Sequence, residues 1–461
     1  MLDVVRHSAS LALFTAVALA SCGPSTGGVS GGPALPSGGA TTASPIKHVI
    51  IVVQENRSFD DLFATFPGAD GATQGLMKTS KGDVPVPLQK VNLGTECDPG
   101  HGYSGFLQSL DGGKMDGFAL KGNKCGGDHT RPYQYVDPEQ IGPYTTIASQ
   151  YVLGDHMFQT QGSGSFTAHQ DLIAGATIVD QNKTTSLVDF PTQTPWGCDA
   201  PGGTTTPELI WTGSRITYKG QGPAPCLSYA TLRDLLDAKD VTWKYYSPPV
   251  KGLHAEGKLW NAFDAIDAVR YSKEWGTNVT FSNTVIFKDI SKNKLPAVSW
   301  VIPDRDESDH PQPLHGDVGP AWVASIVNAI GTSAYWNDSA IVVVWDDWGG
   351  FYDHVPPPLT DHWGGLGFRV PMLVVSAYAR EKKSGTPGYI SKTQYEFGSI
   401  LKFVEETFDL GSLGTTDVRA KSIGDCFDFT QSPRTFYQIS SSHDTAYFLR
   451  RRPSLLPVDT E

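Results

Sequence analysis

Three short runs of apolar, mostly β-branched residues constrain the fold of this chain more than any other feature. They are Val49–Val53, Ser299–Ile302 and Ile341–Trp345. A continuous apolar run of this length is typical of a strand buried on both faces, as in a parallel sheet. Helical patterns separate the runs. This alternation predicts an α/β fold with a large, mostly parallel central sheet flanked by helices on both faces.

The remaining segments are expected to complete a single folded domain over residues 46–461. Helices are predicted at 165–176, 229–238, 259–275, 319–333 and 395–408, and further strands at 241–246 and 369–379. Ser165 is expected to be the N-cap of the first of these helices. Residues 68–144 are rich in Gly and Pro and are expected to be mostly loops.

The first 45 residues have the features of an export signal followed by a tether. The apolar stretch LALFTAVALA is too short to span a bilayer as a stable helix. LASC, Leu19–Cys22, fits the bacterial lipobox pattern, so residues 1–21 are expected to be a lipoprotein signal peptide and Cys22 the lipidated residue. An ordinary secretory signal, with Cys22 incidental, is the alternative. Residues 22–45 are expected to be a flexible tether.

This interpretation predicts an exported protein, lipid-anchored to the bacterial cell envelope at the outer membrane or cell surface, on the periplasmic or extracellular side. Export exposes its cysteines to an oxidising compartment. Cys97 with Cys125, and Cys198 with Cys226, each enclose a loop rich in Gly and Pro, so two local disulfides fit the spacing and Cys426 is left over. The sequence alone leaves the connectivity open, and the spacings do not match a zinc site.

The net charge is −12, from 36 basic and 48 acidic residues. Nucleic-acid binding requires a basic surface, so this balance argues against a nucleic-acid partner. An acidic surface is also repelled by anionic lipid. Contact with a membrane is therefore expected through the lipid anchor.

Polar residues follow all three apolar runs directly. They are Glu55 and Asn56 after the first, Asp304, Asp309 and His310 after the second, and Asp346 and Asp347 after the third. In open α/β sheets, ligands bind outside the carboxyl ends of the strands. If the three strands are parallel neighbours, their polar tails therefore meet at one edge of the sheet.

Carboxylates that share such a space raise one another's pKa, and a bound cation is the simplest remedy. Ligands that are all oxygen favour a hard divalent ion, Ca²⁺, Mg²⁺ or Mn²⁺. Taken singly, a pair of acidic residues after a strand is more often a turn or a helix cap. Two such pairs on separate strands favour one divalent metal site.

Four segments resemble, in order, the motifs of a known family. They are HVIIVVQENRSFDDLF, GDHMFQTQGSGSFTAHQDLIAG, SWVIPDRDESDHP and IVVVWDDWGGFYDHVPPP. The family is the phosphoesterase family that joins bacterial acid phosphatases with non-specific phospholipase C enzymes, and the resemblance covers most of residues 46–410. It implies an alkaline-phosphatase-like fold, a single divalent metal, and a Ser or Thr nucleophile that forms a phosphorylated intermediate.

The resemblance also assigns roles to individual residues. Metal-binding positions fall on Glu55, Asn56, Asp346 and Asp347, with the nucleophile Ser165 at the metal. The phosphate-contacting positions fall on Asn56, His101 and His310. Asp353 and His354 are expected to be structural supports. Without the resemblance, Ser165 could be only a helix cap and His310 only a structural hydrogen-bonding residue.

The chain departs from the family at two points. Phospholipase C members carry Pro-Asn-Arg-like residues after the nucleophile, whereas Phe166, Thr167, Ala168 and His169 follow here. The pair of adjacent histidines found near the leaving group in an acid phosphatase relative is absent from this sequence. The donor of the proton to the leaving group is therefore open among His129, His169, His254 and His315.

The absence of the Pro-Asn-Arg-like residues favours a broad-specificity, acid-phosphatase-like monoesterase that acts on a small phosphate ester. A phospholipase C or another phosphodiesterase, acting on a phospholipid, is the alternative. A third hypothesis is a non-catalytic envelope binding protein that keeps the fold and the cation.

Overall fold

The structure is a computed structural model that describes residues 44–94, 98–120, 127–213, 215–251, 256–311, 316–358, 365–382 and 388–454. The signal peptide, Cys22, the first 22 residues of the tether, Cys97, Cys125, His254 and His315 lie outside these ranges, so the predictions for them stay predictions. The described residues from Ser44 onward form one unit by their contacts. Within them, no helix is both long enough and apolar enough to cross a membrane.

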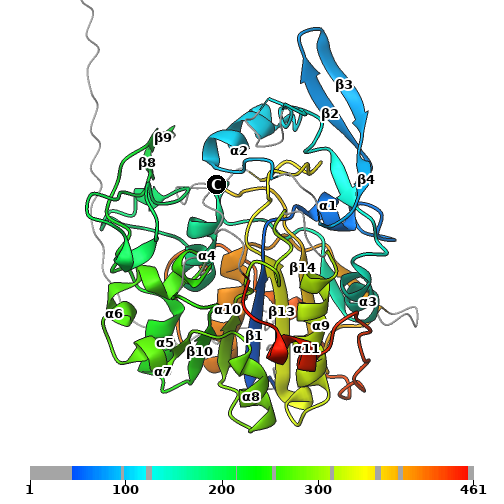
Figure 1. Cartoon of the computed structure of the whole chain (residues 1–461), viewed down its shortest axis with the longest axis vertical. Coiled ribbons are helices and arrows are strands. Elements are labelled where there is room, and N and C mark those ends of the chain that lie inside the picture. The colour runs from blue at the N-terminus through cyan, green and yellow to red at the C-terminus, as the bar shows by residue number, and fades with distance from the viewer. Residues whose placement is uncertain are drawn as a thin grey trace, which may run out of the picture. The chain divides into compact units, whose positions relative to one another are not determined.

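A central eight-stranded sheet dominates the described part of the chain (Figure 1). Its order is β11 (Val279–Thr280), β10 (Trp243–Tyr246), β12 (Val298–Val301), β1 (His48–Gln54), β13 (Ser339–Trp345), β14 (Met372–Ser376), β6 (Val152–Gly154) and β15 (Tyr389–Ser391). Seven of the described strands run in one direction, and β14 alone is antiparallel to its neighbours. The predicted α/β fold with a mostly parallel sheet is confirmed.

The three apolar runs are the adjacent parallel strands β12, β1 and β13. Nearly all of their side chains are fully buried, which accounts for the lack of polar alternation along them. Gln54 at the end of β1 is paired in register with Trp345 at the end of β13. The residues that follow, Glu55 and Asp346, therefore leave the sheet at the same level.

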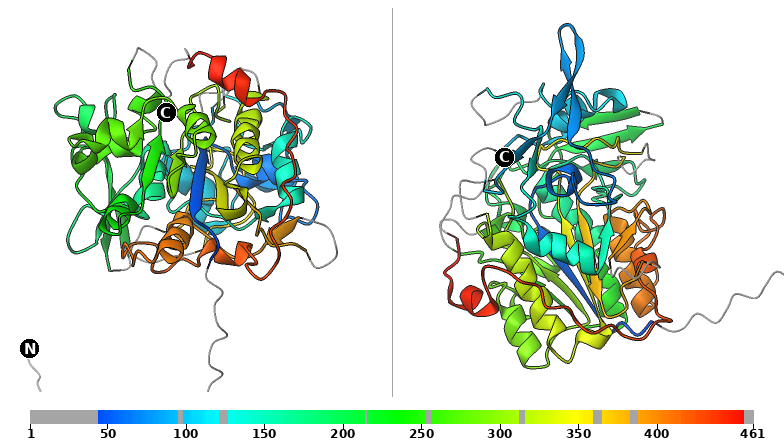
Figure 2. Two further views of the ribbon diagram at one scale, coloured as in Figure 1. Left: turned by 90° about the horizontal axis from the view of Figure 1, so that it is seen from below. Right: turned by 90° about the vertical axis from the view of Figure 1, so that its right-hand side faces the viewer.

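Helices cover both faces of this sheet, as predicted; α9 and α11 lie on one face and α10 on the other (Figure 2). The helices are α1 (Phe59–Phe63), α2 (Tyr103–Leu110), α3 (Gly142–Gln150), α4 (Ser165–Ala174), α5 (Leu232–Ala238), α6 (Asp267–Arg270), α7 (Glu274–Thr277), α8 (Val285–Ser291), α9 (Val318–Gly331), α10 (Phe397–Phe408) and α11 (Thr445–Arg450). Small sheets pair β2 (Gln74–Thr79) with β3 (Gly82–Pro87), β4 (Gln89–Val91) with β5 (Gln134–Val136), and β7 (Thr185–Leu187), β8 (Glu208–Thr212) and β9 (Arg215–Lys219).

The prediction of one amphipathic helix over 259–275 is wrong. The segment contains a 3₁₀ turn at Ala262–Ala265 and the short helices α6 and α7, with extended backbone at Ile266. All the side chains from Leu259 to Ile266 are buried. The prediction assumed a surface helix, which buries one side and exposes the other. In this segment the apolar residues are buried on every side, so their spacing does not indicate a helix.

The cysteine predictions are confirmed where they fall on described residues. Cys198 and Cys226 form a disulfide, with their Cα atoms 4.3 Å apart. Cys426 is a free, fully buried thiol, and burial raises its pKa to about 12. A buried thiol of this kind is chemically inert, so it belongs to the core.

Candidate active site

The QENR segment, residues 54–57 at the end of β1, has four buried side chains with two different roles. Gln54 donates to the Glu307 carbonyl at 3.0 Å and accepts from the Asp309 backbone N–H at 3.1 Å. Arg57 pairs with Asp61 at 3.0 Å. These two residues hold the loops around the sheet edge, and the pair between them, Glu55 and Asn56, enters a cluster at the strand ends.

Asn56 turns the chain at this point. Its φ is +49°, in the left-handed region that Asn tolerates better than most residues. The turn lets the Asn56 backbone N–H donate to Oδ1 of Asp346 at 3.3 Å. Its side-chain amide contacts Asp347 Oδ2 at 3.0 Å and Ser165 Oγ at 3.1 Å. The tails of β1 and β13 therefore meet, as predicted from their order.

Helix α4 brings Ser165 to the same place. The Ser165 hydroxyl lies 3.3 Å from Glu55 Oε2 and 3.2 Å from Asp347 Oδ2. The prediction that Ser165 is the N-cap is wrong, because Gly164 has the extended N-cap backbone and Ser165 is the first helical residue. The hydroxyl is thus directed at the cluster rather than at the backbone of its own helix, and the helix N-terminus beside it favours anions.

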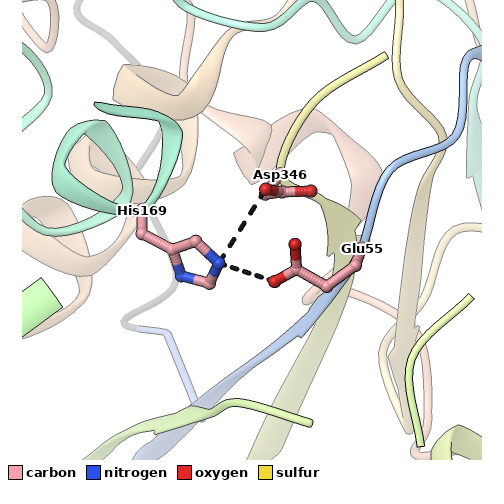
Figure 3. A group of neighbouring side chains, drawn as sticks. All are labelled: Glu55, His169 and Asp346. Atoms are coloured by element: carbon pink, nitrogen blue, oxygen red, sulfur yellow. Dashed lines mark hydrogen bonds and ion pairs between the residues drawn. The ribbon is translucent and has the colours of Figure 1, made fainter. Parts of the chain in front are cut away.

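His169, one turn after Ser165 on α4, forms the centre of a further group with Glu55 and Asp346, which we call the Asp346 cluster (Figure 3). Its Nε2 lies 2.7 Å from Glu55 Oε1 and 3.8 Å from Asp346 Oδ2. The sequence proposed His169 only as one of four proton donors. The four-residue spacing from Ser165 was the signal that places both on one helix face.

Burial and like charge make the Asp346 cluster electrostatically unusual. Burial, and then the charge of Glu55, raise the pKa of Asp346 well above its ordinary value. Burial lowers the pKa of His169 to about 4. The fully buried Oδ2 of Asp346 has no hydrogen-bond donor among the described residues. The residues therefore fit a bound cation, which would relieve the repulsion and contact this oxygen.

The two histidines predicted to contact phosphate lie beside this group. Nε2 of His101 is 2.9 Å from Asn56 Nδ2 and 3.6 Å from Asp347 Oδ2. The ring of His310 has its centroid 6.4 Å from that of His101 and stacks on Trp260. Both imidazoles are buried. The structure thus brings together every described residue that the resemblance assigned to metal or phosphate.

The other acidic residues after β12 have different partners. Asp309 accepts hydrogen bonds from the Tyr144 hydroxyl at 2.8 Å and from Trp345 Nε1 at 3.1 Å. Asp304 pairs with Arg451. His129, another candidate proton donor, is exposed and its Nδ1 contacts the Ala119 carbonyl at 2.9 Å. The contacts of Asp304 and Asp309 therefore indicate structural roles for these two carboxylates.

A second group, which we call the Arg369 cluster, consists of the buried residues Asp60, Asp353 and Arg369 and the half-buried His354. The Arg369 guanidinium forms two hydrogen bonds to Asp353, at 2.9 and 3.0 Å, and lies 3.4 Å from Asp60. His354 Nδ1 is 2.7 Å from Asp60 Oδ2. Arg369 supplies the positive charge here, so these carboxylates have a cation without a metal.

A model of the phosphoesterase family matches residues 46–411. The chain belongs to the phosphoesterase family. The predicted resemblance is confirmed, and with it the prediction of a hydrolase that acts on phosphoric ester bonds.

Named relatives agree with this membership. The phosphoesterase is 26% identical to phospholipase C A of Mycobacterium tuberculosis, over 89% of this chain and 82% of the relative. It is also 26% identical to non-specific phospholipase C3 of Arabidopsis thaliana, over 87% of this chain and 76% of the relative. The solved structure of a Vibrio parahaemolyticus protein in the alkaline phosphatase superfamily is similar with a TM-score of 0.38 and 11% identity. The match covers 83% of this chain and 73% of the Vibrio chain.

Proposed function

We propose that this phosphoesterase cleaves its substrate through Ser165, at a divalent metal ion held by Glu55, Asn56, Asp346 and Asp347. One observation carries the proposal: the Ser165 hydroxyl lies within 3.3 Å of Glu55, Asn56 and Asp347 side chains that come from two separate strand ends. A serine that only capped its helix would bond the helix backbone instead.

The chain's own groups suit a two-step displacement. Ser165 Oγ attacks phosphorus and its proton passes to the Asp347 carboxylate 3.2 Å away. The bond to the leaving oxygen breaks, and the leaving group takes up a proton from water to become the alcohol. The resulting phosphoserine is then hydrolysed by water. His101, His310 and the Asn56 amide are placed to hold the phosphoryl oxygens. The metal, when bound, supplies positive charge that stabilises the serine alkoxide.

Replacement of Ser165 by alanine tests the nucleophile. We expect Ser165→Ala to lower kcat/KM at least about 1,000-fold on p-nitrophenyl phosphate and bis-p-nitrophenyl phosphate, because no other group forms the phosphoryl bond. Metal content should stay near that of the wild type. Ser325→Ala, at a buried serine on α9, is the matched control and should keep its activity. A Ser165→Ala enzyme with the wild-type rate would rule out this nucleophile.

For the substrate, we favour a monoester with broad tolerance, because the Pro-Asn-Arg-like residues of phospholipases are replaced here. The names of the relatives favour a phosphodiester such as a phospholipid, which is the second candidate. The ratio of kcat/KM for p-nitrophenyl phosphate to that for bis-p-nitrophenyl phosphate, together with an assay on phosphatidylcholine, separates the two. A wild-type protein that binds metal and phosphate but cleaves none of the three would instead be a binding protein.

A further inference from the structure

The position of His169 is strongly constrained by its helix. All ten residues of α4 are buried. The Leu172 carbonyl accepts a hydrogen bond from Trp300 Nε1 at 3.1 Å, and Gln170 donates to the Ala262 carbonyl at 2.8 Å. The helix is thus tied to β12 and to the neighbouring 3₁₀ turn. These bonds fix the backbone of α4, and the His169 side chain is itself buried, so the imidazole is held inside the protein next to Glu55.

The distances within the Asp346 cluster are close to those between the ligands of one metal ion. Nitrogen and oxygen ligands bound at about 2.1 Å lie roughly 3.0–3.5 Å apart in tetrahedral or octahedral geometry. The separations from His169 Nε2, 2.7 Å to Glu55 and 3.8 Å to Asp346, fall on either side of this range. The candidate ligand atoms of the three residues all lie within 4.8 Å of one another, close enough to surround one ion.

A hydrogen bond alone accounts for only part of this geometry. An N–H at Nε2 of His169 satisfies Glu55 at 2.7 Å, but it leaves Asp346 Oδ2 without a donor among the described residues. That oxygen is fully buried, where an unsatisfied acceptor is unfavourable. A cation contacted by the three atoms would satisfy all of them at once.

We propose that His169 Nε2 is a direct ligand of the catalytic metal, together with Glu55 and Asp346. The inference rests on the proposed function, because it concerns the ion placed there, and it changes the expected metal. A site with only oxygen ligands favours Mg²⁺, Ca²⁺ or Mn²⁺, whereas an imidazole nitrogen suits later transition metals such as Fe²⁺, Co²⁺ or Zn²⁺. The sequence position that departs from the phospholipase motif thus selects the class of metal.

Electron spin echo envelope modulation (ESEEM) tests this ligand directly. The full-length protein is stripped of metal and reloaded with Mn²⁺ for the measurement. We expect ¹⁴N modulation from a coordinated imidazole in the wild type and its loss in His169→Gln. His101→Gln is the matched control. His101 lies beside Asp347 but is placed to hold phosphate and not the metal, so its replacement should leave the modulation intact. Modulation that persists in Mn²⁺-bound His169→Gln would overturn the proposal.

Metal affinity provides the second measurement. His169→Gln should raise the Kd for Zn²⁺ about 10–100-fold, with a much smaller change for Mg²⁺, and equal changes for both ions would contradict the proposal. If His169→Gln fails to fold, His169→Glu replaces nitrogen by oxygen and should bind Mn²⁺ without ¹⁴N modulation. A wild type that binds Mn²⁺ without ¹⁴N modulation would contradict only the role of His169 as a ligand. A wild type that binds no divalent ion sinks the proposed function as well.

Discussion

The Asp346 cluster and the Arg369 cluster have nearly the same origin in the chain and opposite electrostatics. Each takes one acidic residue from the segment that follows β1, Glu55 or Asp60 of α1, and one from the segment that follows β13, Asp346 or Asp353. In the Arg369 cluster a fully buried guanidinium contacts both carboxylates. In the Asp346 cluster the base between the carboxylates is His169, which has no permanent charge.

This difference shows how a buried acidic pair can be either a support or a reactive site. Burial raises the pKa of Asp353, but Arg369 opposes the shift. Burial and Glu55 both raise the pKa of Asp346, and His169 opposes them only in part. A pair with its own guanidinium is complete as folded, whereas the other pair gains most from an external cation.

The largest expected effect is on the stability of the protein when the Arg369 cluster loses its guanidinium. Arg369→Met leaves Asp60 and Asp353 buried without their guanidinium, which should lower the free energy of unfolding by about 3–5 kcal/mol. Urea denaturation measures this. Lys47→Met, which removes the exposed ion pair with Asp338, should cost less than about 1 kcal/mol. A loss of similar size in both variants would show that Arg369 does not hold its cluster together.

The same substitution, Asp to Asn, should act in opposite ways in the two clusters. Asp346→Asn removes a metal ligand and should lower kcat/KM at least about 100-fold. It also removes a repelling charge, so the melting temperature in EDTA should stay the same or rise. Asp353→Asn should retain most activity but melt at a lower temperature, because it weakens the pairing with Arg369. Equal loss of activity in both variants would contradict the distinction.

The smallest effect concerns pH. Burial lowers the pKa of His354, but the hydrogen bond and charge of Asp60 outweigh it and raise the pKa above the ordinary value of 6.5. The folded state therefore binds the proton more tightly. Its stabilisation is complete below pH 6.5 and is lost as the pH rises through the folded-state value.

His354→Gln should thus reduce the free energy of unfolding more at pH 5.5 than at pH 8.5. The imidazole is partly exposed, so solvent screening limits the difference to about 1 kcal/mol or less. Urea denaturation of both proteins at the two pH values measures it. A larger loss at pH 8.5 than at pH 5.5 would mean that His354 is neutral in the folded protein.

Much of the fold and of the candidate site followed from local pattern. The apolar runs predicted β1, β12 and β13, because a strand buried on both faces requires apolar side chains at every position. The order of polar residues after them placed Glu55, Asn56, Asp346 and Asp347 at one edge. The family resemblance added the roles of Ser165, His101 and His310, which the local pattern of apolar and polar residues does not assign.

Other features depend on contacts between distant segments. The direction of β14 depends on which neighbours accept its backbone hydrogen bonds, and its apolar residues are the same for either direction. The break in 259–275 reflects burial on every side, which the tertiary packing imposes. Asp60, Asp353 and Arg369 are far apart in the chain, and no spacing rule links a carboxylate to its guanidinium.

By itself, the sequence determined which strands lie in the middle of the sheet and which acidic residues leave their ends, since both depend on side-chain polarity along a short segment. Only the tertiary structure decided which acidic pair receives Arg369 and which receives His169. The reason is that the electrostatics of a buried carboxylate depends on the charges within a few ångströms of it, and those come from segments that the fold alone brings together.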